Sequence, residues 1–203
     1  MRNPLSRKLS FKLIWESYKS KEVESRRLIL QKGRMESRLH IILKVLAFCY
    51  FWDRNLIIEP RFPFNRYKPD LISWQKSEIP TKEELIPDLW IECKAVNLKK
   101  LIRLSHAFPQ SSIVWMHSLQ PLSRTVRNIE SKNAKYRLAL NLHFIGIETA
   151  HKNWILLEES MENRHIQWVA TQPIRNSIMI EIKNMNGYPI PFQFHDLLTT
   201  IKK

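Results

Sequence analysis

The feature that most constrains the fold is an apolar, strand-like run that carries two charges, Trp90-Ile91-Glu92-Cys93-Lys94-Ala95-Val96. Successive side chains of a strand point to opposite faces of the sheet, so Glu92 and Lys94 are expected on one face, roughly 7 Å apart. Burying a charge without a partner is costly, because the charge loses its hydration. The run therefore predicts a strand whose two charges serve a chemical purpose.

Two Pro-Asp pairs, Pro69-Asp70 and Pro87-Asp88, offer a second carboxylate near Glu92. Asp88 precedes Glu92 by four residues along one predicted strand, which separates them by roughly 13 Å. Asp70 can instead begin the neighbouring strand, and adjacent strands lie about 4.8 Å apart. Asp70 and Glu92 are therefore the expected pair. Their oxygen atoms suit Mg²⁺ or Mn²⁺, and Mg²⁺ would keep several waters and accept a substrate phosphate as a further ligand.

The charge balance indicates the kind of partner. The formal net charge is +14 over 203 residues, with 33 Lys and Arg against 19 Asp and Glu. This bias favours a polyanion, because neutralising phosphates releases counterions and strengthens binding without any reading of sequence. A generally basic proteome is the alternative explanation. A membrane surface is not favoured, since no basic amphipathic helix is evident.

The pattern of apolar residues predicts the order of elements. Residues 10–31 resemble a β-hairpin, and a helical period follows Gly33. Further strands are predicted at 56–59, 70–74, 88–96, 112–117, 142–147, 167–170 and 177–183, and further helices at 98–108, 122–135 and 151–161. This order predicts an α/β (α+β) protein. One domain over residues 1–203 is expected, with a core of about 33–120, the N-terminal hairpin and a C-terminal extension, 122–203.

Several features suggest a cytoplasmic protein. No uncharged apolar run reaches 18 residues, and Lys44 interrupts the most apolar stretch, residues 39–52. The basic segment Met1–Lys12 lacks the apolar stretch of a signal peptide. Cys49 and Cys93 lack disulfide-like or CxxC spacing, which favours a reducing compartment.

Glu36 and His40 lie four residues apart near the start of the helix predicted after Gly33. For Glu36, the alternative to a functional role is a first-turn glutamate stabilised by the helix dipole. His40 could reach a phosphate or a group beside a metal, and a structural histidine facing the sheet is the alternative.

The helix predicted after Lys94 carries Lys99, Lys100 and Arg103. These side chains are expected to follow the backbone of a nucleic acid, with a solvated basic face as the alternative. Lys94 itself could act on a water molecule or hold a phosphate. Its alternative is a salt bridge with one of the two carboxylates, and a buried pair of that kind is often unfavourable for stability.

The Pro-Asp pair followed by Glu-x-Lys on the next strand resembles the signature of the PD-(D/E)XK nuclease-like superfamily. The chain is also similar to the YaeQ-like family of that fold. The residues that carry this second resemblance are the N-terminal strand pair, Met35–Leu39 leading into Leu46–Phe48, Pro69–Leu71, Leu89–Glu92, Leu101 and Arg103, Ile113–Trp115 and Ser177–Lys183.

The resemblance implies a restriction-endonuclease-like core, a mixed central sheet flanked by helices, with additional N- and C-terminal strands. It also implies that Asp70 and Glu92 hold the metal, with Glu36 as the additional carboxylate, and that Lys94 helps prepare the attacking water. The YaeQ-like family has no settled activity and often departs from Glu-x-Lys, whereas this chain has Lys94.

The expected function is a Mg²⁺- or Mn²⁺-dependent endonuclease that hydrolyses phosphodiester bonds of DNA, with RNA as the other substrate considered. The alternative is a catalytically inactive nuclease-fold protein that binds nucleic acid or a partner from the transcription machinery. A homodimer would allow cleavage of both strands. Three glycines exclude a standard P-loop or GxGxxG cradle, and neither a GxSxG elbow nor zinc-type spacing of His and Cys occurs.

Overall fold

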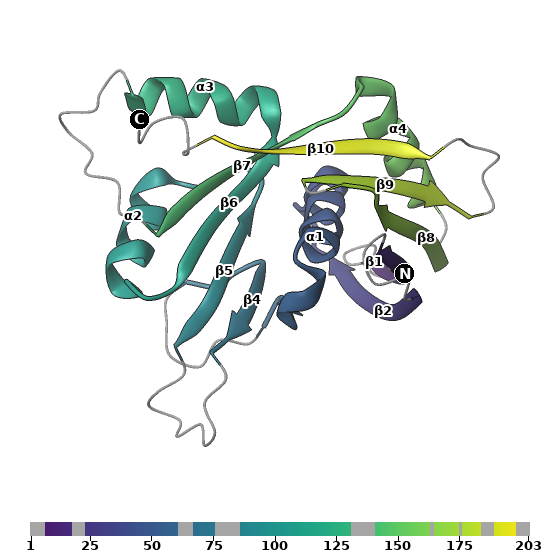
Figure 1. The fold of residues 1–203 in the computed structure, drawn as a ribbon, viewed down its shortest axis with the longest axis horizontal. Coiled ribbons are helices and arrows are strands. Elements are labelled where there is room, and N and C mark those ends of the chain that lie inside the picture. The colour runs from purple at the N-terminus through teal and green to yellow at the C-terminus, as the bar shows by residue number, and fades with distance from the viewer. Residues whose placement is uncertain are drawn as a thin grey trace. The chain divides into compact units, whose positions relative to one another are not determined.

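The computed structural model describes residues 7–17, 23–60, 67–75, 86–130, 141–162, 165–174, 176–183 and 189–197. The chain forms two compact units. Unit 1 comprises Met1–Tyr50 and Glu148–Phe194, and unit 2 comprises Phe51–Ile147 and His195–Lys203. Figure 1 shows the elements of both units. The prediction of one domain stays a prediction.

Unit 1 contains five strands in the order β2-β1-β8-β9-β10. Their bounds are β1 Arg7–Ser17, β2 Val23–Lys32, β8 His165–Gln172, β9 Ser177–Ile182 and β10 Ile190–Asp196, the last of which belongs to this unit as far as Phe194. β1 runs antiparallel to β2 and parallel to β8, and β9 is antiparallel to both β8 and β10. The helices of this unit are α1 (Arg38–Tyr50) and α4 (His151–Ser160).

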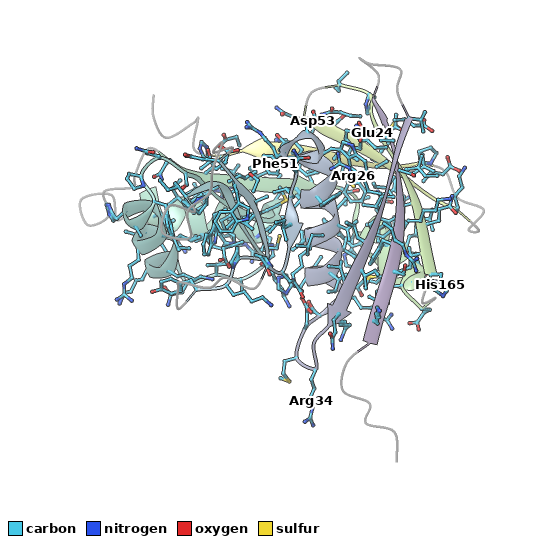
Figure 2. The ribbon with its side chains drawn as sticks, turned by 90° about the horizontal axis from the view of Figure 1, so that it is seen from below. Glu24, Arg26, Arg34, Phe51, Asp53 and His165 are labelled. Atoms are coloured by element: carbon cyan, nitrogen blue, oxygen red, sulfur yellow. The ribbon has the colours of Figure 1, made fainter. Side chains whose placement is uncertain are left out.

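One face of the unit 1 strands builds its core. Leu9, Phe11, Leu13 and Trp15 alternate along β1 and are all buried, as period-two patterning requires. Phe11 meets Trp168 of β8 edge to face, with ring centroids 5.3 Å apart. α1 is buried continuously over residues 41–49, which is typical of a helix covered on every side. Figure 2 shows α1 beside the long strands β1 and β2.

Unit 2 contains five strands in the order β7-β6-β5-β4-β3. Their bounds are β3 Ile57–Ile58, β4 Leu71–Trp74, β5 Pro87–Cys93, β6 Ser112–Ser118 and β7 Leu142–Glu148, the last of which belongs to this unit as far as Ile147. β5, β6 and β7 are parallel, while β4 runs antiparallel to β3 and β5. A 3₁₀ turn, Trp52–Arg54, precedes β3, and the helices α2 (Leu98–Ala107) and α3 (Leu119–Glu130) connect the parallel strands.

α2 and α3 cover the same face of the unit 2 sheet. Leu101 and Leu104 of α2 belong to one buried cluster with Trp90 of β5 and Trp115 of β6. Leu122, Val126 and Ile129 of α3 join the same cluster. The start of α3 lies so close to β7 that a Cβ added at Gly146 would be 2.5 Å from Leu119 Cδ1. Residues whose side chains share the face of Trp90 therefore lie beneath the two helices or at their ends.

The α+β class is confirmed, and the structure places a strand pair at the N-terminus and further strands toward the C-terminus. One boundary near the predicted site and one missed strand are corrected. β5 ends at Cys93 and does not continue to Val96, and the Pro-rich end contains the unpredicted strand β10. Residues 131–135, predicted as the end of a helix, lie outside the described residues. Within the described residues, each helix is too short or too polar to cross a membrane.

Candidate functional site

Asp70 and Glu92 lie near each other at one end of the unit 2 sheet. The register of β4 and β5 pairs Leu71 with Ile91 and Ile72 with Trp90, and Asp70, the residue before β4, comes next to the end of β5 that carries Glu92. The backbone N–H of Asp70 donates to the Ile91 carbonyl at 3.1 Å. Glu92 shares the face of Trp90, which α2 and α3 cover, and the charge of Asp70 acts on it. The structure therefore brings together the two carboxylates that the sequence predicted as a pair.

Glu92 is the more buried of the two, with 5% of its surface exposed. Its Oε1 atom accepts a hydrogen bond from Trp90 Nε1 at 2.8 Å and one from Lys100 Nζ at 2.6 Å. Burial raises the pKa of Glu92, the Lys100 and Trp90 contacts oppose this, and the charge of Asp70 adds to the increase. A further cation near this carboxylate would offset both the cost of burying its charge and its repulsion with Asp70.

Asp70 is half-buried and is held by the backbone of the neighbouring strand. Its Oδ2 atom accepts a hydrogen bond from the N–H of Cys93 at 2.7 Å. Cys93 is the last residue of β5, so this bond connects the beginning of β4 to the end of β5. The carboxylate orientation is therefore fixed by the backbone.

Lys100 is part of the site, although the sequence suggested only a contact with nucleic acid. It lies in the first turn of α2, whose N-cap Asn97 accepts a hydrogen bond from Lys99 N. Its ammonium group pairs with Glu92 and lies 5.7 Å from the centre of the Tyr67 ring. Lys99 and Arg103 are exposed on the same helix, as a contact with the backbone of a bound nucleic acid requires.

Lys94 takes a conformation that the sequence did not predict. Its φ of 65° is left-handed, and β5 has already ended at Cys93. Its N–H donates to the Met116 carbonyl at 3.0 Å, and its own carbonyl accepts a hydrogen bond from Trp115 Nε1. Regular strand alternation therefore ends before Lys94, and the placement of its side chain on the face of Glu92 stays a prediction. Whether Lys94 acts on water stays a prediction.

His117, near the end of β6, lies close to Lys94 and was not among the residues predicted from the sequence. It shares a face with Trp115, which lies opposite Glu92 in the register of β5 and β6. Its Nδ1 atom lies 2.9 Å from Ser118 Oγ. Burial lowers the pKa of His117, and the charge of Lys94 lowers it further. The alternation along Ser112–Ser118 was the signal that could have placed it on this face.

Glu36, the predicted additional carboxylate, belongs to unit 1. It accepts hydrogen bonds from Gly33 N at 3.0 Å and Lys44 Nζ at 2.6 Å, and His40 Nδ1 lies 2.9 Å from its Oε1. Burial alone would raise the pKa of Glu36, but the contacts with His40, Lys44 and Gly33 outweigh it and lower the pKa to about 2. The metal role of Glu36 and the phosphate role of His40 stay predictions.

The donor set of the unit 2 site fits a hard divalent cation. Within the part of the chain that the structure describes, no three His, Cys, Asp or Glu side chains are grouped so that they could hold a metal ion. Asp70 and Glu92 provide two carboxylates, and Mg²⁺ typically binds through one or two carboxylates, waters and substrate phosphates. Two carboxylates that repel each other at the end of a sheet are therefore a suitable, if minimal, set.

Comparison with known proteins identifies the fold. No protein-family profile and no curated protein matches the chain. Two solved structures share its fold, the YaeQ proteins from Xanthomonas axonopodis pv. citri and from Pseudomonas syringae. The TM-score is 0.68 for both, at 17% and 16% sequence identity. The match covers 95% of this chain and 98% and 96% of the two YaeQ chains.

Proposed function

We propose that this chain is a YaeQ-like member of the PD-(D/E)XK superfamily and a metal-dependent phosphodiesterase that acts on DNA, with RNA as the other substrate to be tested. The observation that carries the proposal is the proximity of Asp70, which precedes β4, to Glu92 of β5, because the charge of Asp70 raises the pKa of Glu92. A restriction-endonuclease-like core in unit 2 is part of the same proposal.

Asp70 and Glu92 would hold Mg²⁺ or Mn²⁺ through their carboxylate oxygens. The metal would supply a bound water of lowered pKa and stabilise charge on the phosphate. Asp70 is suited to this role because the hydrogen bond from the backbone N–H of Cys93 holds its carboxylate in place. Glu92 is suited because it is buried beside Asp70, so an added cation stabilises its charged form.

Lys100 and Lys94 would have separate roles, Lys100 at the phosphate and Lys94 at the attacking water. Lys100 neutralises Glu92 in the structure and would contact a phosphate oxygen when another cation competes for that carboxylate. Lys94 lies at the rim of the site, where its half-buried side chain would orient a water molecule. Lys99 and Arg103 are exposed on α2 and would hold the backbone of the substrate.

The test is Mg²⁺- or Mn²⁺-dependent cleavage of DNA and RNA by wild type, Asp70→Asn and Glu92→Gln. The matched control is Asp88→Asn, which alters the other Pro-Asp pair. Asp88 is 40% exposed and accepts hydrogen bonds from Arg54 and Ser73, each at 3.4 Å. We expect both site variants to lose at least 100-fold in rate, since metal-site ligands are worth that much or more. The control should cleave like wild type.

The catalytically inactive alternative is favoured by one observation, the contact between Lys100 and the same Glu92 oxygen that Trp90 contacts. That arrangement would let Lys100 take the place of a metal permanently. The alternative would be supported, and the nuclease contradicted, if wild type binds DNA without cleaving it and calorimetry detects no binding of Mn²⁺. Metal uptake that Glu92→Gln abolishes would support the nuclease.

A further inference from the structure

The side of unit 1 that faces away from its aromatic core carries a concentration of basic side chains. It is made by alternate residues of β1, β2, β8 and the end of β9, and we call it the outer face. Its basic and polar members include Lys8, Ser10 and Lys12 of β1, Arg27 and Gln31 of β2, His165 and Gln167 of β8, and Lys183. All are exposed except Ser10 and Gln167, which are partly exposed.

The strand register aligns four of these residues in one row across the strands. Arg27 lies opposite Lys12, and Lys12 lies opposite Gln167. Lys183 donates its N–H to the Gln167 carbonyl at 2.9 Å and so completes the row. Three strand spacings of about 4.8 Å separate its ends, which gives a span of about 14 Å. The row therefore places Arg27 and Lys12 on adjacent strands and Lys183 at its far end, with the neutral Gln167 between Lys12 and Lys183.

Charge on this face is unevenly distributed. Its acidic members, Glu16 and Glu181, lie on the side of the row away from Lys8 and His165. Glu181 pairs with Lys183 at 2.8 Å. Within the described residues, neither Lys8 nor Lys12 forms an ion pair, and Arg27 Nε donates to Ser10 Oγ at 3.0 Å. Among the described residues, Lys8, Lys12 and Arg27 therefore lie exposed on one face without an acidic partner.

The outer face carries no Phe, Tyr or Trp among its described residues. The aromatic residues of these strands, Phe11, Trp15 and Trp168, lie on the opposite face and are buried. Proteins that hold single strands stack bases on exposed aromatic rings. A basic, non-aromatic face suits contacts with phosphates, which is the way a double helix is bound without reading its sequence.

We propose that the outer face of unit 1 binds the phosphate backbone of double-stranded DNA. Lys8 and Lys12 are four residues apart on one strand, a separation of about 13 Å, and the row through Lys12 spans about 14 Å. Both are close to the width of the major groove of B-DNA, about 12 Å. Lys8, Lys12 and Arg27 therefore contact phosphates on both sides of a groove. This surface is independent of Asp70 and Glu92.

The experiment measures fluorescence anisotropy of a labelled 20-base-pair DNA duplex in EDTA, so that cleavage plays no part. Lys12→Gln/Arg27→Gln removes two charges from the outer face, and Lys8→Gln/Lys12→Gln does so without touching the Arg27 hydrogen bond. Arg34→Gln/Lys152→Gln is the control. Both of its residues are exposed in unit 1, Arg34 on the connection between β2 and α1 (Figure 2) and Lys152 on α4.

Each lost phosphate contact lowers the slope of log K against log salt by about 0.9 and weakens binding at 0.1 M salt by about eightfold. We expect both outer-face variants to bind about 50-fold more weakly with a slope lower by about 2, and the control to match wild type. Equal loss in the control, or no loss in either outer-face variant, would overturn the proposal. Tighter binding of a single strand or of duplex RNA would overturn the assignment to duplex DNA.

Discussion

The Glu36 network in unit 1 makes the sharpest energetic prediction. Its side chain is 11% exposed, and that of its partner Lys44 only 3%. The lowering of the Glu36 pKa from 4.5 to about 2 corresponds to about 3 kcal/mol of stability at neutral pH, because each tenfold change in proton affinity is worth about 1.4 kcal/mol. Glu36→Gln is the perturbation, since the amide keeps the shape and can still accept the Gly33 hydrogen bond.

The sign of the pH dependence follows from the lowered pKa. The stabilisation from ionised Glu36 is fully present above pH 4.5 and is lost as pH falls toward 2, because the unfolded chain takes up the proton first. The difference in unfolding free energy between wild type and Glu36→Gln should therefore shrink by about 1.5 kcal/mol between pH 7 and pH 3.5.

The assay is urea unfolding followed by circular dichroism at several pH values. In a His40→Gln background the imidazole adds no pH dependence, and a smaller difference is expected because the His40 contact helps to lower the pKa of Glu36. Glu24→Gln is the control, because Glu24 pairs with Arg26 at 3.2 Å on the surface of β2 (Figure 2) and exposed pairs contribute little. A constant difference between wild type and Glu36→Gln from pH 7 to pH 3.5 would refute the reasoning.

Three further predictions concern single positions. Lys94→Gly should raise the free energy of unfolding, measured in urea, by about 0.5–1 kcal/mol. The strain of a φ of 65° at a non-glycine residue is larger than the conformational entropy that a glycine loses on folding. A loss of stability would contradict this. Gly146→Ala should lower the free energy of unfolding by about 1–3 kcal/mol, because the new Cβ would be 2.5 Å from Leu119 Cδ1 and 3.3 Å from its Cα; an unchanged denaturation midpoint would be inconsistent with that contact. Burial raises the pKa of Cys49 to about 12, so a thiol reagent at pH 8 should label this cysteine only after unfolding, and rapid labelling of the native protein would show that the site opens.

The carboxylate pair was predictable because it follows from distance alone. Four residues along one strand put Asp88 too far from Glu92, while a neighbouring strand brought Asp70 within reach. The register of β4 and β5 agrees with that argument. The α+β class was equally accessible, since long apolar periods define the helices and the central strands.

The roles of the lysines were not predictable from spacing. Lys94 follows a regular apolar run, and nothing in that run indicates that its backbone turns left-handed after Cys93. Lys100 is eight residues from Glu92, and it reaches the carboxylate because α2 begins at Leu98 and folds back over the face of β5. Such a contact depends on where a helix starts, which is among the least certain features of a sequence pattern.

β10 escaped prediction for a related reason. Pro191 lacks a backbone N–H and suggests an interruption, yet it pairs with Met179 in the antiparallel register of β9 and β10. The apolar residues Ile190, Phe192 and Phe194 alternate around it and are buried, so core burial outweighs the missing donor. The same balance explains Lys94: the hydrogen bonds of its peptide groups to Met116 and Trp115 compensate for an unfavourable φ. Local sequence preferences therefore gave wrong predictions at positions where tertiary contacts stabilise the fold by more than the unfavourable backbone conformation or missing hydrogen bond costs.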